Sequence, residues 1–240
     1  MRPLLLVLFA VPLASPPLAL AQGGGLDPAS LLAPLENSWP TYSGDYSGRR
    51  YSKLTQVNID NVQQLTLAWT RTLDSGMPAL EGANAPDFTG GEGDGDFTIG
   101  SQRIKGSILQ VGDLLYVTAP DHVWALDVRD GGERWHYFWK TRGGPHIGNR
   151  GAALWRDSLI FETVDNYLVA LDAKTGEERW HTEIASFEEQ YFSTMAPIVI
   201  GDHLLVGTGN DLDAPGFLQS FDPETGGLQW RFYTVPMSED

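Results

Sequence analysis

The sequence contains no cysteine, little basic charge and few long apolar runs. Without cysteine, no disulfide bond can stabilise the fold, even in an oxidising compartment. There are 16 Lys and Arg residues against 31 Asp and Glu residues, which gives a formal net charge of −15. Contacts to phosphate require basic side chains, so we expect no nucleic-acid partner. No stretch has the periodicity of an amphipathic helix, which favours an all-β fold.

The most pronounced apolar run lies near the N-terminus, at residues 4–13. It is too short and too interrupted by proline to span a bilayer, so we expect a protein that is not transmembrane. Arg2 before the run and an Ala-Leu-Ala motif at 19–21 predict a secretory signal peptide over residues 1–21; a buried N-terminal helix is the alternative. Residues 22–37, rich in Gly, Pro and Ala, predict a flexible lead-in.

A pattern of Asp, a short turn containing Gly, and then Trp occurs three times. The three copies end at Trp135, Trp180 and Trp230, which are 45 and 50 residues apart. In each copy the Asp side chain can cap the turn by accepting backbone N–H bonds, and Gly supplies the positive φ that closes it. A repeat of about 40–50 residues with several short strands is typical of a β-propeller blade. Three unrelated hairpins that end in Trp are the alternative.

Each repeat also contains four short segments with the composition of strands. Apolar residues are grouped in runs of about four to six residues, separated by Gly, Asp and Asn residues that favour turns. The sequence therefore predicts blades near residues 107–138, 151–184 and 195–233, within one β-propeller domain over residues 38–240. A Trp at the same place in each repeat suits a large flat group packed between neighbouring sheets.

Residues 65–70 alternate in polarity and predict a strand that places Trp69 where a blade's last Trp should stand. No blade precedes this segment, so we interpret it as a ring-closing strand that completes the final blade. Propellers have about four to eight blades, and this sequence supplies about three. We therefore expect a partial propeller, the N-terminal part of a longer protein; a self-sufficient four-bladed ring is the alternative. Residues 58–62 predict a short helical turn capped by Asn58 or Asp60.

Residues 75–102 form a long segment rich in Gly and acidic residues. Within it, residues 90–96 nearly match a calcium-binding nonapeptide of Gly and Asp. The spacing is off by one residue, however, and there is no tandem copy. We expect a solvated surface loop here rather than a metal site.

Further motifs lie outside the Trp repeat. They are Tyr51-Ser52-Lys53-Leu54-Thr55-Gln56-Val57-Asn58, Asn149-Arg150-Gly151, Thr194-Met195-Ala196-Pro197, Gly207-Thr208-Gly209-Asn210-Asp211 and Trp230-Arg231-Phe232-Tyr233-Thr234. With these motifs the sequence resembles the pyrroloquinoline-quinone (PQQ) dependent alcohol dehydrogenases, periplasmic quinoproteins with an eight-bladed propeller, over about residues 38–237. The resemblance implies a periplasmic location, and PQQ on the propeller axis, held by loops at the top of successive blades.

PQQ carries three carboxylates and an ortho-quinone, so its site needs a cation and hydrogen-bond donors. The resemblance implies cofactor contacts at Arg150, Thr163, Thr208, Gly209 and Asn210. Arg150 would bond the quinone oxygen, for which a planar guanidinium is suited. The resemblance also implies that Asp211 is a ligand of Ca²⁺, an ion that takes carboxylate and amide oxygens. The residues alone leave two alternatives open. Arg150 is then a surface residue in a salt bridge, and Asn210 and Asp211 are ordinary turn residues in a Gly-rich loop.

The sequence departs from the family at several positions. Lys105 stands where the family has an acidic cofactor contact, although a Lys could still pair with a PQQ carboxylate. Gly144-Pro145 stands where a pair of Cys residues often covers the cofactor. His146 is a candidate acid or base, with a polar surface residue as the alternative. The family's catalytic Asp would lie after residue 240, so we name no catalytic residue and expect the 240-residue chain alone to be inactive.

The resemblance implies oxidation of an alcohol by hydride transfer to Ca²⁺-bound PQQ, with the electrons passed to a cytochrome c. A small alcohol and a cytochrome c are therefore the expected partners. Two alternatives stay open, a sugar-oxidising quinoprotein and a non-enzymatic propeller that acts as a protein-binding scaffold. The polar residues at blade-top positions favour the enzyme, whereas the missing acidic and Cys contacts favour the scaffold.

Overall fold

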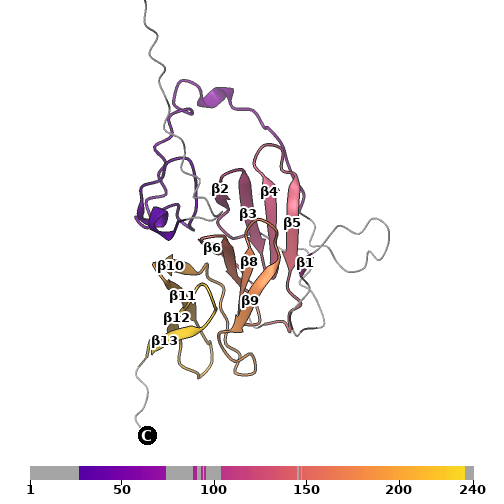
Figure 1. Ribbon diagram of the computed structural model, residues 1–240, viewed down its shortest axis with the longest axis vertical. Helices are drawn as coiled ribbons and strands as arrows, with labels where there is room; N and C mark the ends of the chain where they lie inside the picture. The colour runs from indigo at the N-terminus through magenta and orange to yellow at the C-terminus, as the bar shows by residue number, and fades with distance from the viewer. Residues whose placement is uncertain are drawn as a thin grey trace, which may run out of the picture.

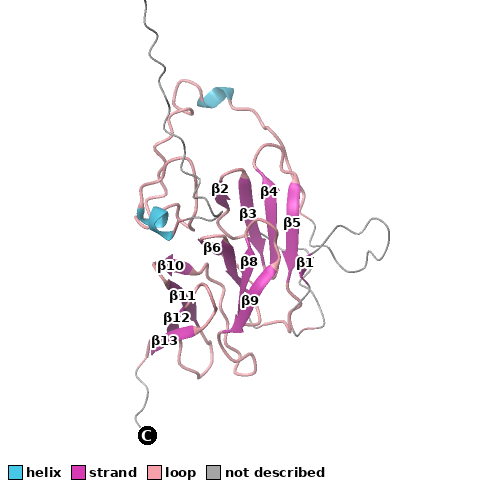
Figure 2. Ribbon diagram, viewed as in Figure 1, coloured by secondary structure: helices cyan, strands magenta, loops and turns pink. Residues whose placement is uncertain are grey.

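Three antiparallel sheets, each built from four strands that follow one another in the chain, form most of the structure (Figure 1). The computed structural model describes residues 27–73, 89–90, 93, 95, 104–144, 146 and 148–235. The predicted signal peptide and most of the acidic segment at 75–102 lie outside the described residues. The prediction of an all-β fold with propeller-like repeats is confirmed (Figure 2).

The strands follow the order expected for successive blades. The first sheet contains β2 (Leu109–Val111), β3 (Leu114–Ala119), β4 (His122–Asp127) and β5 (Glu133–Phe138), and β1 (Thr89–Gly90) pairs in parallel with β5. The second contains β6 (Ala152–Trp155), β7 (Ser158–Glu162), β8 (Tyr167–Asp172) and β9 (Glu178–Glu183). The third contains β10 (Ile198–Ile200), β11 (His203–Thr208), β12 (Phe217–Phe221) and β13 (Leu228–Tyr233). In the described part of the chain, no helix is long and apolar enough to cross a membrane.

The burial of the strands follows the position of each sheet. All residues of β6 and β7 are buried, because the second sheet has a packed neighbour on both faces. One apolar cluster fills the space between the first and second sheets, and a separate cluster fills the space between the second and third sheets. Every residue of β13, the last strand of the third sheet, is exposed.

A Trp ring packed over a Gly turn joins each sheet to the sheet that follows it. Trp135, on β5, donates its indole N–H to the carbonyl oxygen of Ala173 at 3.2 Å. The ring lies over Gly176, whose φ is +78°, and a methyl group at that Gly would stand 2.7 Å from it. Only Gly therefore fits this turn, both for its backbone conformation and for the space beneath the ring.

The same contact occurs on either side of that pair. The ring of Trp69 lies over Gly131 and donates its N–H to the Val128 carbonyl oxygen at 3.1 Å. The ring of Trp180 lies over Gly226. Trp230 is the exception, since its residue is 39% exposed and it covers no Gly turn among the described residues.

The N-terminal segment differs from two expectations. The strand predicted over residues 65–70 is wrong: Trp69 docks as a blade's last Trp would, but the backbone around it forms no strand, since it has no partner strand in the described part of the chain. The predicted helical turn exists as the 3₁₀ helix η2 (Val62–Gln64), and its N-cap is Asn61 rather than Asn58 or Asp60.

The lead-in contains more structure than the flexible segment predicted for residues 22–37. Asp27 caps the 3₁₀ helix η1 (Pro28–Leu32) by accepting the N–H of Ala29 at 2.9 Å. Leu31 is 2% exposed and joins the apolar cluster between the second and third sheets. Figure 1 shows this indigo segment beside β2, β6 and β10, the first strands of the three sheets.

The unequal burial of the Trp rings predicts unequal stability losses. We expect Trp135→Ala to lower the free energy of unfolding by about 3–5 kcal/mol, because it removes a buried ring and leaves a cavity. Trp230→Ala serves as the matched control and should cost less than Trp135→Ala, since Trp230 is 39% exposed whereas Trp135 is 6% exposed. Urea unfolding followed by circular dichroism measures both values. Equal losses for the two variants would contradict the docking role of Trp135.

Candidate functional site

The residues singled out for chemistry gather at one end of the three sheets. Antiparallel pairing places the start of a sheet's first strand and the turn between its second and third strands at the same end. We call this end the loop end; its described residues are 104–108, 120–121, 139–144, 146, 148–151, 163–166, 184–197 and 208–216. The Asp–Gly turns lie at the opposite end of each sheet, which we call the turn end. Every residue predicted to contact PQQ or calcium lies at the loop end.

Two exposed cations extend from neighbouring stretches of backbone at the loop end. Ser107 donates its N–H to the Arg150 carbonyl oxygen at 3.1 Å, which brings the segment containing Lys105 beside Arg150. Both side chains are exposed, and neither has an ion-pair or side-chain hydrogen-bond partner among the described residues. In a chain with a net charge of −15, two unpaired cations that start side by side suit an anionic ligand.

Thr163 is placed differently from an exposed ligand contact. It follows β7, is fully buried, and its hydroxyl donates to the Asp165 carboxylate at 2.7 Å. The same hydroxyl accepts the N–H of Tyr167 at 3.0 Å. These two bonds close the turn between β7 and β8. The Thr163 side chain therefore supports the loop end from beneath.

The loop that follows β11 is tied to the connection between the second and third sheets. Gly209 exchanges two backbone hydrogen bonds with Phe192, at 2.9 and 3.0 Å. Asn210 donates its amide to the Glu189 carbonyl oxygen at 2.7 Å, and its amide oxygen accepts the N–H of Leu212 at 2.7 Å. Thr208 is 5% exposed, and Gln219 lies 3.5 Å from its hydroxyl. The loop is thus held in place by its own polar groups.

Asp211 and His146 lie together, although 65 residues separate them in the sequence. The Nε2 atom of His146 is 2.6 Å from the Asp211 carboxylate, and both side chains are about half exposed. The imidazole ring also packs against Phe192, with 4.2 Å between the ring centroids. Both residues were singled out from the sequence, but nothing in the sequence indicated this pairing.

The donor set fits an anion better than it completes a metal site. Calcium takes six to eight oxygen ligands, mostly from carboxylates and carbonyls. In the described residues no group of three or more His, Cys, Asp or Glu side chains is gathered as a metal site would require. Asp211 offers one accessible carboxylate, whereas both polar atoms of the Asn210 amide are already engaged. Arg150 and Lys105, by contrast, have no competing partners among the described residues and match the charge of a carboxylate ligand.

Glu162, a buried acid at the loop end, was missed in the reading of the sequence. It is the last residue of β7, is 1% exposed, and its carboxyl contacts the Ser193 hydroxyl. Burial raises the pKa of Glu162 to about 8, against the opposing effects of the Ser193 hydroxyl and the Met195 backbone N–H. The sequence did contain a signal for Glu162. It follows the apolar run Leu159-Ile160-Phe161 directly, and an acid is rarely buried at the end of such a strand.

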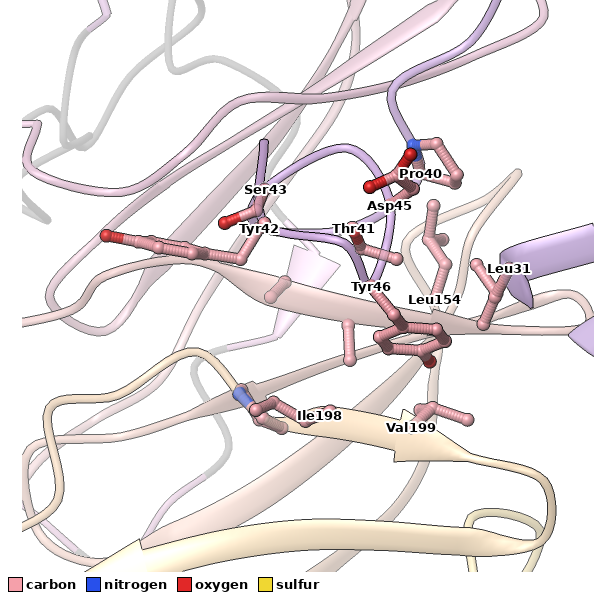
Figure 3. A pocket seen from close by; sticks show the side chains of 14 residues that line it. Leu31, Pro40, Thr41, Tyr42, Ser43, Asp45, Tyr46, Leu154, Ile198 and Val199 are labelled. Atoms are coloured by element: carbon pink, nitrogen blue, oxygen red, sulfur yellow. The ribbon is translucent and has the colours of Figure 1, made fainter. Parts of the chain in front are cut away.

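A cavity of about 190 Å³ lies between the N-terminal segment and the starts of β6 and β10 (Figure 3). Its walls are mainly apolar, from residues such as Leu31, Leu154 and Val199, with hydroxyl groups added by the N-terminal segment. The one charged side chain among its lining residues, Asp45, already accepts bonds from the Ser47 N–H and hydroxyl. This lining does not suit a tricarboxylate.

Fold and site together define an arc of propeller blades with a polar loop end from which Lys105 and Arg150 extend. The family model described as "PQQ: Glucose/ethanol/alcohol dehydrogenase, beta-propeller domain" matches residues 39–240. The chain therefore belongs to the family of PQQ-dependent dehydrogenase propellers.

Individual relatives agree with this assignment. The quinohemoprotein alcohol dehydrogenase ADH IIB of Pseudomonas putida is 31% identical over 98% of this chain and 32% of its own length. The quinoprotein glucose dehydrogenase of Escherichia coli is 38% identical over 46% of this chain and 12% of its own length. Among solved structures, the quinohemoprotein alcohol dehydrogenase ADHIIG of Pseudomonas putida matches with a TM-score of 0.66 and 30% identity, over 83% of this chain and 27% of its own. The chain spans about a third or less of the length of these relatives.

The hydrogen bonds of Thr163 predict a structural effect of its mutation. Thr163→Val keeps the shape but removes a buried hydroxyl with two partners, so we expect a loss of about 1–3 kcal/mol in the free energy of unfolding. Thr208→Val is the matched control and should cost less, because its hydroxyl has one long contact. Thermal and urea unfolding measure the difference. A Thr163→Val variant as stable as wild type would contradict the supporting role.

Proposed function

We propose that this chain is part of a PQQ-dependent alcohol dehydrogenase and that its loop end supplies one side of the cofactor site. The observation that carries the proposal is a pair of cations, Lys105 and Arg150, that lie on adjacent backbone segments of an acidic protein and have no ion-pair partner among the described residues. A site that binds a multiply charged anion needs cations that internal salt bridges do not already neutralise. Both alcohol dehydrogenases of Pseudomonas putida described above support the choice of reaction.

Each residue of the loop end has a proposed role that its surroundings allow. Arg150 and Lys105 bind carboxylate or quinone oxygens, Arg150 through its planar guanidinium. The backbone bonds between Gly209 and Phe192 hold the loop that presents Asp211, which contributes one oxygen to Ca²⁺. Thr163 holds the turn beneath the site. Bound PQQ would supply the two-electron acceptor for alcohol oxidation, with the metal ion as a Lewis acid on its quinone oxygen.

The proposal also covers what lies outside this part of the protein. We propose that further blades follow, because the exposed Trp230 stands where three other Trp residues each cover a Gly turn. The catalytic base and the remaining metal ligands would come from those blades. The predicted signal peptide over residues 1–21 supports a periplasmic location, where a cytochrome c would accept the electrons. The glucose dehydrogenase relative supports a sugar as the second candidate substrate.

Binding of PQQ to the purified chain tests the proposal. We expect PQQ to bind in the presence of Ca²⁺, and Arg150→Ala to weaken that binding roughly 10–100-fold, because a charged hydrogen bond contributes about 1.5–3 kcal/mol. Asp211→Ala should reduce the effect of Ca²⁺ on the affinity. Isothermal titration calorimetry measures each affinity, and circular dichroism verifies that every variant is folded.

Arg156→Ala is the matched control, because it removes the same charge from the turn between β6 and β7, at the other end of β6 from Arg150. Its affinity for PQQ should equal that of the unmodified chain. Equal weakening by both Arg variants would mean that overall charge, rather than a site, governs binding. A folded chain with no affinity for PQQ at all would refute the cofactor site and favour the scaffold alternative.

A further inference from the structure

Glu162 lies at the junction of the second and third sheets. On β7 it stands opposite Leu168 of β8, and its backbone carbonyl accepts the Asn149 amide at 3.1 Å. Its carboxyl group reaches across to Ser193, in the connection that leads to the third sheet. The other carboxyl oxygen, Oε1, is buried without a hydrogen-bond partner among the described residues. An ionised carboxylate in this position would be costly, since burial penalises the charged form more than the Ser193 hydroxyl and the Met195 backbone N–H favour it.

Ser193 has two acceptor oxygens within reach but only one hydroxyl hydrogen. Its Oγ contacts Oε2 of Glu162 and also lies 2.9 Å from the Gly207 carbonyl oxygen. If Glu162 were ionised, one of these two short contacts would join acceptor to acceptor with no hydrogen between them. A proton on Glu162 satisfies both contacts, because the carboxyl group then donates to Ser193 and Ser193 donates to Gly207.

We propose that Glu162 is a positioning residue, whose neutral carboxyl group ties the end of β7 to the end of β11 through Ser193. Gly207 immediately precedes Thr208 and the loop that carries Asp211, so the tie fixes the base of that loop. The consequence for PQQ rests on the proposed function, whereas the tie itself does not. Deprotonation removes the hydrogen that the tie requires, so the loop is held at neutral pH and released at alkaline pH.

Among the residues that the structure describes, the surroundings of Glu162 contain no titratable partner that would reverse this behaviour. The contacting elements present Leu168 from β8, Asn149 from the connection before β6, and Ser193 and Met195 from the connection before β10. None of these side chains carries a charge. Burial is the main cause of the elevated pKa of Glu162, and no neighbouring charge contributes to it.

The sign of the pH dependence follows from proton uptake. In the unfolded chain the carboxyl group ionises near its ordinary pKa of 4.5, whereas in the folded protein it keeps its proton up to a pH of about 8. Folding therefore takes up a proton between these two values, and stability falls as the pH rises through that window. Below a pH of 4.5 the contribution of Glu162 to stability is fully present.

Glu162→Gln tests the proton directly, because the amide has the same shape, donates to Ser193 and does not titrate. We expect the Tm of this variant to exceed that of wild type increasingly between pH 5 and 8, by roughly 3–5 °C for each pH unit. Glu177→Gln, at an exposed Glu in the turn between β8 and β9, is the matched control and should follow the wild-type profile. A constant difference between Glu162→Gln and wild type across the range would overturn the proposal.

Two further measurements test the tie and its consequence. Hydrogen exchange at the Gly209 and Phe192 amides should accelerate above pH 8 in wild type beyond the intrinsic pH effect, and should not do so in Glu162→Gln. Ser193→Ala should show fast exchange at every pH, and slow exchange in that variant would count against the tie.

The affinity for PQQ should fall above pH 8 in wild type but not in Glu162→Gln. If the stability and exchange results hold but the affinity does not change with pH, Glu162 does not position the cofactor loop; if no PQQ binds, the proposed function fails while the tie stands.

Discussion

The rest of the fold depends on the contact between a Trp ring and a Gly turn. Each contact joins the last strand of one sheet to the turn end of the next, as Trp135 over Gly176 shows. The Asp residue that opens the turn fixes its shape: Asp172 accepts the N–H groups of Lys174 and Thr175, both at 2.9 Å. A local turn thereby determines where a sheet some 40 residues away packs. Adjacent sheets cannot slide relative to each other without lifting the ring off its Gly.

This dependence explains how much of the fold could be predicted. The turn, its Asp and its Trp are all encoded within about ten residues, so the sequence revealed the repeat and the strands between its copies. The segment around Trp69 was predicted wrongly as a strand, because the Trp contact is local but a strand needs a partner backbone. Trp69 docks without a partner strand in the described part of the chain.

The candidate site was less predictable than the fold, for a physical reason. Family motifs indicated which residues reach the loop end, but a motif does not state which hydrogen bonds its side chains already make. Thr163 is committed to its own turn, and the pairing of His146 with Asp211 joins segments 65 residues apart. Glu162 was missed because an acid at the end of an apolar strand resembles a surface residue until its neighbours are known. These properties depend on tertiary contacts rather than on local pattern.

Carboxylates hold Arg side chains in ion pairs at the turn end, and at the loop end they hold Arg142 in the same way, whereas Arg150 and Lys105 have no ion-pair partner among the described residues. At the turn end, carboxylates are paired: Arg129 and Arg134 both contact Asp127 and hold the pKa of its carboxyl well below the ordinary value. Around Arg150, which has no ion-pair partner in the part of the chain that the structure describes, burial raises the pKa of both Glu162 and Asp121 and favours their neutral forms. Neutral acids do not cancel the field of nearby cations, whereas ionised ones would. Lys105 and Arg150 therefore stay available to an anionic ligand, even though the chain as a whole is strongly acidic.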